Sequence, residues 1–430
     1  MGARGRVAET PRERLRMRIV EASRVKGRVA APPSKSHTVR AVLLAGLAEG
    51  RSVLVRPSRC EDALAALDLA RTLGARVEEQ GEEMALTGGP SSAGGVFECG
   101  ESGFCLRAGT ALAALFDSEC TVTGRGSLMS RPVGPVETPL RALGARCETA
   151  GGLPPVSVRG PLRGGVAEVD GSHGSQFLSG LLMALPLCPG DSRVRVEGLR
   201  SGPYVRMTLA CIEAFGGRVE HEADLSRFRI RGGQRYRATR VEVEGDWSGA
   251  SFLLVAGAVA GEAEVTGLDP GSLQPDRAVL SALSDAGAEI TWGSEALRVR
   301  RGDLRAFDFD LTDCPDLFPP LAVLACACAG TSVLKGVGRL RTKESDRAAA
   351  LVSELGRLGG RLRLDGDRMV IRGGPLWGGE VDSGGDHRIA MAGAVAGLLC
   401  PNGAAVVGEA CVAKSYPGFF DDLDSIRMES

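Results

Sequence analysis

The chain has 430 residues, and its 52 Lys+Arg and 53 Asp+Glu leave a formal net charge of −1 at pH 7. This balance excludes a global field that recruits nucleic acid or anionic membranes, and an aromatic content of only 4% argues against base-stacking surfaces. The 12 Cys include no CxxC pair and there are only 4 His, so neither disulfides nor a metal site is expected. We therefore expect a large cytoplasmic protein with enough chain for two cores.

The first segment, residues 1–15, is rich in arginine but carries Glu9 and Glu13 and has no apolar centre. It lacks the features of a signal peptide, and a disordered extension is the expected state. Further along, no apolar stretch reaches the length needed to cross a bilayer.

From there the chain repeats. A glycine that ends an amphipathic helix recurs with spacings of 70, 72, 71 and 72 residues, at Gly74, Gly144, Gly216, Gly287 and Gly359. Glycine at this place supplies the left-handed conformation that stops a helix. A period of this length indicates one supersecondary unit that has been copied.

A second landmark repeats in step, namely a polar or glycine-rich opening followed by a run of small apolar residues. There are six such runs: PSKSHTVRAVLLAGLA, GESGFCLRAGTALAAL, GSQFLSGLLMALPL, WSGASFLLVAGAVA, CPDLFPPLAVLACA and DHRIAMAGAVAGLL. Each run is hydrophobic nearly all round, which predicts a buried helix, and a short valine-rich strand follows it. The predicted unit is βαβαββ in a mixed α/β fold, with six copies that group as three plus three.

The openings of the six runs differ, whereas the helix bodies stay alike. Helix N-termini present unpaired N–H groups and a partial positive charge, so they suit anions. Lysine, arginine and hydroxyl side chains with few carboxylates decorate these openings and the loops after the strands. This distribution predicts a cleft for one or two strongly anionic small molecules.

Seven short motifs give the chain a specific resemblance. They are Ser34-Lys35-Ser36 with Arg40, Ser130-Arg131-Pro132, Gly174-Ser175-Gln176-Phe177, Glu244-Gly245-Asp246, Lys343-Glu344-Ser345-Asp346-Arg347, Asp386-His387-Arg388 and Ala413-Lys414-Ser415. In order and spacing, from about residue 17 onward, the chain resembles the enolpyruvyl transferases. The resemblance implies a two-domain inside-out α/β barrel with three βαβαββ repeats per domain. The implied domains are 33–244, and 16–32 together with 245–430.

The resemblance implies that phosphoenolpyruvate donates its enolpyruvyl group to the 5-hydroxyl of shikimate 3-phosphate. The implied ligands of phosphoenolpyruvate are Lys35, Gly103, Arg131, Gln176, Arg347, Arg388 and Lys414. Those of shikimate 3-phosphate are Lys35, Ser36, Arg40, Gly174, Ser175, Gln176, Ser201, Tyr204, Asp316, Arg339 and Lys343. No cofactor, metal, nucleic acid or membrane partner is implied, and a monomer is expected.

The reaction needs a base for the attacking hydroxyl and an acid for the methylene carbon. The resemblance assigns Asp316 as the base and leaves Glu344 and Lys35 as alternative acids. His387 is implied in the release of phosphate. A carboxylate surrounded by cations stays ionised more readily, which favours Asp316 as the first proton acceptor.

Each motif also has a purely structural interpretation. Ser34 or Ser36 suits a helix cap, 343–347 suits an exposed salt-bridged turn, and Asp386 suits a helix start. Three positions depart from the family pattern, namely Glu101, Phe104 and Arg339. Glu101 near a phosphate site requires a cation such as Arg107, and Phe104 is expected to narrow the phosphoenolpyruvate pocket.

Three other functions are alternatives. Transfer to another cyclitol phosphate is one, motivated by Glu101 and Arg339. Transfer to UDP-N-acetylglucosamine is another, although that branch carries Lys-Asn where this chain has Lys35-Ser36, and a loop cysteine that residues 125–130 lack. A non-catalytic anion-binding scaffold is the third, but it needs neither Asp316 nor Glu344.

Overall fold

The computed structural model describes residues 16–91 and 94–428, so the predicted extension at 1–15 lies outside the described residues. The chain divides into two compact units. The central unit comprises Pro33–Asp246 and Asp269–Pro275. The terminal unit comprises the described chain up to Pro32, Trp247–Leu268 and the chain from Asp276 onward.

The small segment Asp269–Pro275 differs from the sequence-based division, which places it in the other domain. A side-chain hydrogen bond joins this segment to the central unit. The Gln274 side chain, 4% exposed, donates from Nε2 to the carbonyl of Gly245 at 2.7 Å.

The central unit contains three four-stranded sheets among the described residues. In sheet order they are β14 (Arg240–Glu242), β3 (Gly50–Val55), β5 (Glu83–Gly88), β4 (Arg76–Gln80); then β6 (Gly95–Glu98), β7 (Cys120–Thr123), β9 (Leu153–Arg159), β8 (Arg146–Ala150); then β10 (Gly165–Asp170), β11 (Ser192–Glu197), β13 (Arg227–Ile230), β12 (Glu220–His221). In each sheet the first pair is parallel and the other two pairs are antiparallel. The predicted βαβαββ repeat is confirmed in this unit.

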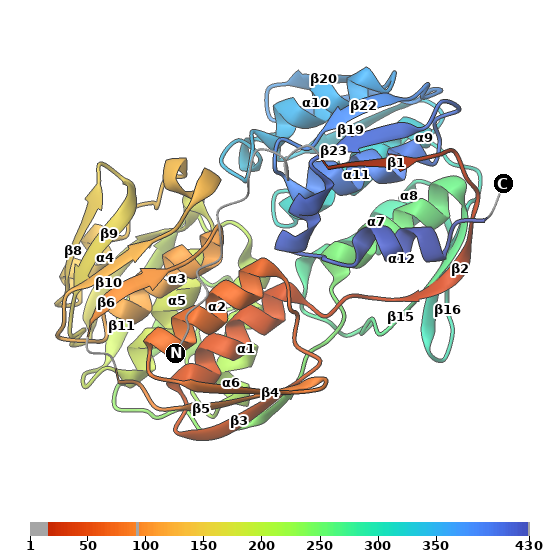
Figure 1. Ribbon diagram of the computed structural model, residues 1–430. Coiled ribbons are helices and arrows are strands. Elements are labelled where there is room, and N and C mark those ends of the chain that lie inside the picture. Colours follow the sequence, from red (N-terminus) through yellow and green to blue (C-terminus); the bar gives the residue numbers. More distant parts are fainter. Residues whose placement is uncertain (1–15, 92–93, 429–430) are drawn as a thin grey trace. The chain divides into compact units, whose positions relative to one another are not determined.

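Six α-helices accompany these sheets in the described part of the unit. They are α1 (Lys35–Leu47), α2 (Glu61–Thr72), α3 (Gly103–Ala113), α4 (Glu137–Ala142), α5 (Gln176–Ala184) and α6 (Gly202–Ala214). Figure 1 shows α1, α3 and α5 enclosed within the unit, as their apolar runs predict. Small residues permit this packing, because a Cβ on Gly180 of α5 would lie 2.4 Å from the Cα of Ala108 on α3. One hydrophobic core fills the unit.

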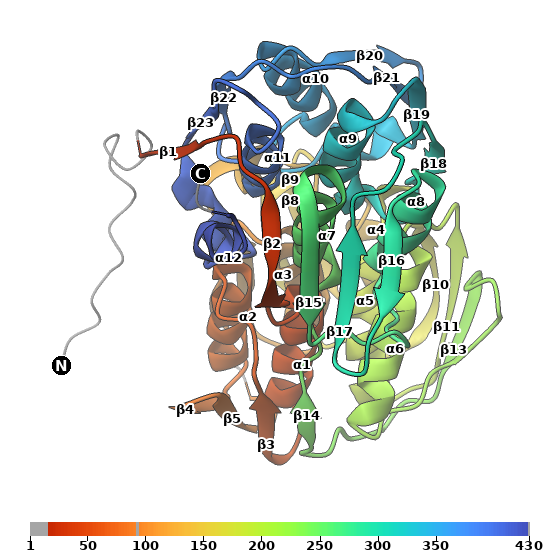
Figure 2. The ribbon, with the colours of Figure 1, turned by 90° about the vertical axis from the view of Figure 1, so that its right-hand side faces the viewer.

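The terminal unit repeats the pattern. Its sheets are β2 (Val25–Ala30), β15 (Gly261–Thr266), β17 (Ala296–Arg300), β16 (Glu289–Trp292); then β18 (Asp308–Asp310), β19 (Thr331–Lys335), β21 (Arg368–Arg372), β20 (Arg361–Asp365); then β22 (Gly379–Asp382), β23 (Ala404–Val407), β1 (Met17–Val20). Figure 2 shows β2 beside β15, with which it pairs in parallel. Strands from the start of the chain thus complete sheets that later residues begin.

The terminal unit's helices are α7 (Trp247–Ala260), α8 (Val279–Asp285), α9 (Phe318–Ala327), α10 (Arg347–Arg357), α11 (His387–Gly397) and α12 (Phe419–Ser425). Every residue of α7 and α11 is buried, and a second hydrophobic core surrounds them. Within residues 16–91 and 94–428, no helix is both long and apolar enough to cross a membrane. Burial of 11 of the 12 cysteines agrees with their predicted role as small hydrophobic residues.

Candidate active site

Helix α1 carries the first predicted site residues at its N-terminal end. Ser34 caps the helix by accepting from the backbone N of His37 at 3.2 Å, and Asp246 accepts from the backbone N of Lys35 at 2.8 Å. The Lys35 ammonium forms an ion pair with Asp62 of α2, with 2.9 Å between Nζ and Oδ2. Asp62 was not predicted, and it fixes the lysine before any ligand binds.

Arg40 follows on α1 and is 2% exposed. Its Nε donates to Thr208 Oγ1 at 2.9 Å, Nη1 donates to the carbonyl of Ser36 at 2.8 Å, and Nη2 donates to the carbonyl of Tyr204 at 3.3 Å. The Phe104 ring centroid lies 4.5 Å from Arg40 Cζ. Burial lowers the pKa of Arg40 to about 10. The predicted ligands Ser36, Arg40 and Tyr204 are therefore brought together.

The start of α3 gathers residues of the central unit that the sequence predicts as ligands of phosphoenolpyruvate. A Cβ on Gly103 would lie 3.0 Å from Arg107 Nη1 and 3.1 Å from Arg131 Nη2, so both guanidinium groups lie against this glycine. Arg107 Nη1 in turn donates to Gln176 Oε1 at 2.9 Å. Arg131, 8% exposed, follows the 3-10 helix η2 (Gly126–Ser130). Gly103, Arg131 and Gln176 thus surround Arg107, a side chain that the sequence resemblance did not assign as a ligand.

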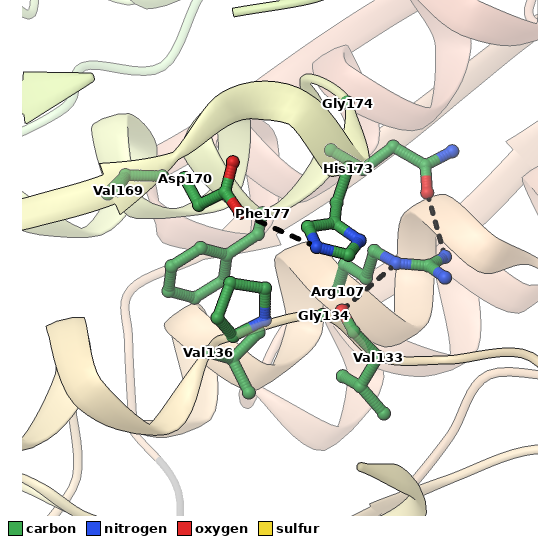
Figure 3. A pocket seen from close by; sticks show the side chains of 11 residues that line it. Arg107, Val133, Gly134, Val136, Val169, Asp170, His173, Gly174 and Phe177 are labelled. Atoms are coloured by element: carbon green, nitrogen blue, oxygen red, sulfur yellow. Dashed lines mark hydrogen bonds and ion pairs between the residues drawn. The ribbon is translucent and has the colours of Figure 1, made fainter. Parts of the chain in front are cut away.

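A small hollow lies beside these residues in the central unit (Figure 3). The predicted ligands Gly174 and Gln176 line it, together with Arg107. Its apolar wall consists of Val133, Pro135, Val136, Val169 and Phe177. At its rim, Asp170 Oδ2 lies 3.5 Å from His173 Nε2. The hollow therefore combines an apolar wall with a few polar side chains.

The predicted ligands of the sugar phosphate lie at helix starts. Ser175 directly precedes α5 and Ser201 directly precedes α6, and each is 4% exposed. Ser201 has φ 59° and ψ 41°, a left-handed conformation that costs a non-glycine residue about 1–2 kcal/mol. Gly174 has φ 116° and ψ −174°, a region open essentially to glycine alone. Glycine adopts its conformation without strain, whereas the backbone strain at Ser201 is typical of a binding site.

In the terminal unit, Asp316 is the centre of a cationic group. It lies in the 3-10 helix η6 (Pro315–Leu317), just before α9. Its carboxylate forms ion pairs with Lys343 Nζ at 3.3 Å, Arg347 Nη1 at 3.0 Å and Arg388 Nη2 at 3.2 Å. Three cations thus surround the carboxylate that the sequence predicts as the base.

Arg347 is fully buried at the first position of α10. Asp386 binds it through two oxygens, at 3.0 Å from Nε and 3.1 Å from Nη2, and Glu344 accepts from Nη2 at 2.6 Å. Burial lowers the pKa of Arg347. The carboxylates of Asp386, Glu344 and Asp316 together raise it by more than burial lowers it, so the net shift is upward. Of the two interpretations of 343–347, the exposed salt-bridged turn is wrong because Arg347, the last residue of the segment, is buried.

Lys343 and Arg388 complete this group. Burial lowers the pKa of Lys343, and Asp316 offsets only part of this effect. Arg388 Nη2 also donates to Ser248 Oγ at 2.7 Å, and its backbone N donates to Asp386 Oδ1 at 3.0 Å. Asp386 therefore caps α11, as the structural interpretation of that motif predicts, and also holds Arg347.

The remaining predicted residues occupy neighbouring segments of the terminal unit. Arg339 ends the 3-10 helix η7 (Val337–Arg339), and Lys414, 4% exposed, ends η8 (Glu409–Lys414). His387 opens α11 and is 1% exposed, with Nδ1 at 3.9 Å from Asp386 Oδ1.

The predicted residues thus form two groups. The central unit holds Lys35, Ser36, Arg40, Gly103, Arg131, Gly174, Ser175, Gln176, Ser201 and Tyr204. The terminal unit holds Asp316, Arg339, Lys343, Glu344, Arg347, His387, Arg388 and Lys414. We refer to Asp316, Lys343, Glu344, Arg347, Asp386 and Arg388 as the paired cluster, because direct ion pairs join them.

One expectation is wrong. The sequence indicated cations with few carboxylates, yet the paired cluster matches its three cations with three carboxylates. The physical reason is that a buried cation requires a counter-charge in the folded protein before any anionic ligand arrives.

Two of the residues that depart from the family pattern, Glu101 and Phe104, lie in the central unit. Glu101 Oε2 accepts from Ser127 Oγ at 3.2 Å, and its carboxylate lies against Gly126 in the segment before Arg131. Phe104 stacks on Arg40, a predicted acceptor ligand. Among the described residues, no group of three or more His, Cys, Asp or Glu is arranged to hold a metal ion.

Fold and site together define an α/β protein whose helix starts carry cationic and hydroxyl side chains. Residues 19–423 match the family model described as EPSP synthase (3-phosphoshikimate 1-carboxyvinyltransferase). A 3-phosphoshikimate 1-carboxyvinyltransferase of Methanocorpusculum labreanum is 42% identical over 417 residues, which is 96% of this chain and 98% of the relative. One from Aeropyrum pernix is 43% identical and covers 94% of each chain.

The solved structures agree. An EPSP synthase from Acinetobacter baumannii superimposes with a TM-score of 0.80 at 28% identity, over 96% of this chain and 98% of that chain. The chain therefore belongs to the EPSP synthase (3-phosphoshikimate 1-carboxyvinyltransferase) family, and the predicted fold class is confirmed.

Proposed function

We propose that this chain transfers the enolpyruvyl group of phosphoenolpyruvate to the 5-hydroxyl of shikimate 3-phosphate, releasing phosphate, as a step of aromatic amino acid biosynthesis. One observation carries the proposal: the similarity runs through 98% of a relative named for this activity, at 42% identity. The described site residues support it because the two substrates bring phosphate and carboxylate groups that need fixed cations.

On the donor side, we assign phosphoenolpyruvate to Lys35, Gly103, Arg131, Gln176, Arg347, Arg388 and Lys414. Arginine suits this ligand because its planar guanidinium meets a carboxylate or phosphate through two parallel hydrogen bonds. Asp316 and Asp386 support the assignment by fixing Arg347 and Arg388 in place before the substrate arrives. Fixed donors lose little freedom on binding.

On the acceptor side, Ser175, Ser201 and Lys343 are assigned to the phosphate of shikimate 3-phosphate. Gly174 and Gln176 contribute beside them. Ser36 and Arg40 are assigned to its carboxylate. Tyr204 and Arg339 are assigned to its ring.

The chemistry requires two proton transfers. Asp316 accepts the proton of the 5-hydroxyl as the oxygen forms a bond to C2 of phosphoenolpyruvate, and Glu344 or Lys35 donates a proton to the methylene carbon. The adduct then loses phosphate and a proton from the new methyl group, which restores the double bond. Lys35, Lys414 and His387 are assigned to the departing phosphate. Their positive charge stabilises the leaving group.

Phosphate release in the presence of both substrates tests the proposal. Wild-type protein should release phosphate only when shikimate 3-phosphate and phosphoenolpyruvate are both supplied, with an equal amount of enolpyruvyl product. Asp316→Asn, which keeps the shape of the side chain, is the inactive control. Absence of release by wild-type protein would remove the proposal.

The same assay separates the alternatives. Release with UDP-N-acetylglucosamine instead would favour the sibling activity, and release only with another cyclitol phosphate would favour a specialised pathway.

The domain division 33–244 against 16–32 with 245–430 is also proposed. So is action as a cytoplasmic monomer, without nucleic acid or membrane partners. Light scattering after size exclusion tests the oligomeric state.

A further inference from the structure

We infer that Phe104 is a positioning residue that holds the Arg40 guanidinium for the carboxylate of the acceptor substrate. The inference rests on the proposed function and adds to it. The sequence alone relates Phe104 to the phosphoenolpyruvate pocket, whereas the structure places its ring 4.5 Å from Arg40 Cζ.

The charge of Arg40 is unusual within the described chain. The side chain is 2% exposed, yet no carboxylate of residues 16–91 or 94–428 lies within ion-pair distance of it. Its acceptors are a hydroxyl and two carbonyls, all neutral. Burial accordingly lowers its pKa to about 10, which records the cost of an unbalanced buried cation. Such a charge is available to an incoming anion.

The hydrogen bonds of Arg40 indicate how that anion would bind. A guanidinium has five N–H donors in a fixed plane. Thr208, Ser36 and Tyr204 take one each, from Nε, Nη1 and Nη2. One N–H on Nη1 and one on Nη2 are left over. A pair of donors on the two terminal nitrogens is the fork that a carboxylate accepts through both oxygens.

The aromatic rings fix the plane of this fork. Phe104 lies 4.5 Å and Tyr204 lies 5.7 Å from Arg40 Cζ, both within the range of a cation–π contact. Such a contact stabilises the cation most where water is excluded. A phenylalanine therefore supplies here the electrostatic support that carboxylates supply to Arg347.

Phe104 also links the two substrate groups. It is the second residue of α3, directly after Gly103, and Gly103 lies against Arg107 and Arg131. Successive helical side chains point about 100° apart. The start of α3 thus places the Gly103 backbone, which is assigned to phosphoenolpyruvate, next to Phe104. Phe104 in turn orients Arg40, which is assigned to shikimate 3-phosphate.

Simple core packing is the competing explanation, because Phe104 is 9% exposed and borders the central core. The test compares Phe104→Leu with Phe116→Leu. Phe116 follows the same helix at its other end, packs against the same core and lies over no cation of the described chain. Steady-state phosphate release gives kcat and the KM of each substrate, and urea unfolding monitors stability.

Phe104→Leu should raise the KM for shikimate 3-phosphate about tenfold while kcat and the KM for phosphoenolpyruvate change less than about threefold. Phe116→Leu should leave all three near wild type. In an Arg40→Met background the effect of Phe104→Leu should disappear, because contacting residues that act through one charge are not additive. Phe104→Met replaces Phe104→Leu if the latter does not fold.

An equal KM rise in both phenylalanine variants would overturn the inference. So would a full Phe104→Leu effect in the Arg40→Met background, since core packing does not depend on that charge. Wild-type protein that releases no phosphate would instead refute the proposed function, so the two failures are distinguishable.

Discussion

Arg347 in the terminal unit and Arg40 in the central unit are both buried arginines near a helix start, yet the fold accommodates their charges in opposite ways. Arg347 is held by Asp316, Glu344 and Asp386, and its pKa is raised in spite of burial. Arg40 is held by neutral oxygens and aromatic rings, and burial lowers its pKa to about 10.

The difference separates two tasks. A cation balanced within the protein is rigid, and its removal leaves other charges buried and unpaired. A cation that the protein leaves unbalanced gains its counter-charge only when a ligand binds. We therefore expect changes in the paired cluster to affect both catalysis and stability, and changes at Arg40 to affect mainly binding of the acceptor.

The largest effect is expected at Asp316. Asp316→Asn keeps the size of the side chain but removes the proposed base, so kcat should fall by about 10³–10⁴. Binding of shikimate 3-phosphate, measured by calorimetry, should persist within about tenfold, because Asn retains an acceptor for Lys343.

Asp310→Asn is the matched control. Asp310 is an exposed aspartate on β18 that accepts from the backbone N of Thr312 and belongs to no ion pair with the cluster. Its variant should keep full turnover. Normal turnover in Asp316→Asn would refute the assignment of the base.

The second prediction compares the two arginines directly. Arg347→Met leaves Asp386 buried with its main partner removed, so the free energy of unfolding should fall by about 3–5 kcal/mol. Arg40→Met removes a charge with no carboxylate partner and should cost less than about 1.5 kcal/mol. Urea unfolding measures both. Equal losses would contradict the distinction between a balanced and an unbalanced cation.

Arg388 tests whether a cluster member also serves the donor. Arg388→Gln should raise the KM for phosphoenolpyruvate about 100-fold, since one charge-assisted pair to a ligand is worth about 2–3 kcal/mol. The KM for shikimate 3-phosphate should change far less. Arg372→Gln on the exposed end of β21 is the control and should change neither constant. A uniform rise in both constants would point to general disturbance of the cluster instead.

Much of the fold was predictable because it follows from local pattern. The spacing of Gly74, Gly144 and their counterparts predicted the repeat, and the apolar runs predicted buried helices. Spacing alone did not predict the sheet that joins β2 to β15, because that pairing links residues more than 200 positions apart. Only the family resemblance implied such a crossing.

The candidate site divides in the same way. Motifs identified the candidate cations, but not the side chains that hold them. Asp62 lies within an ordinary amphipathic helix, and nothing in its local sequence distinguishes it from Asp68 on the same helix. The contact of Phe104 with Arg40 joins two helices and has no sequence signal. Partners of this kind depend on tertiary packing alone.

Gly103 allows a smaller change on the central side. In Gly103→Ala the new Cβ would lie 3.0 Å from Arg107 Nη1 and 3.1 Å from Arg131 Nη2. Both atoms end flexible side chains, so they should shift by tenths of an ångström and raise the KM for phosphoenolpyruvate about tenfold with little loss of stability. Gly356→Ala on α10 is the control, because nothing lies within 4 Å of its Cβ. An unchanged KM for phosphoenolpyruvate in Gly103→Ala would show that Arg107 and Arg131 do not take part in binding this substrate.

The smallest effect concerns His37, which shares α1 with Arg40. Burial first, and the charge of Arg40 second, lower the pKa of His37 from 6.5 to about 4, while Glu244 lies 4.0 Å from its Nδ1. As the pH falls, His37 therefore takes up a proton at a higher pH in the unfolded chain than in the folded chain. The free energy of unfolding should fall as pH drops from 6.5 toward 4.

Arg40→Met removes the second cause and leaves the first. The pKa of His37 should then rise but stay below its usual value, because burial still lowers it. With only 4 His in the chain, NMR titration of the imidazole signals measures this, and His37→Gln assigns the resonance. If an internal carboxylate balanced Arg40, the neighbouring histidine would not sense its loss. An unchanged pKa of His37 would therefore show that Arg40 is not the unbalanced charge that binding of shikimate 3-phosphate requires.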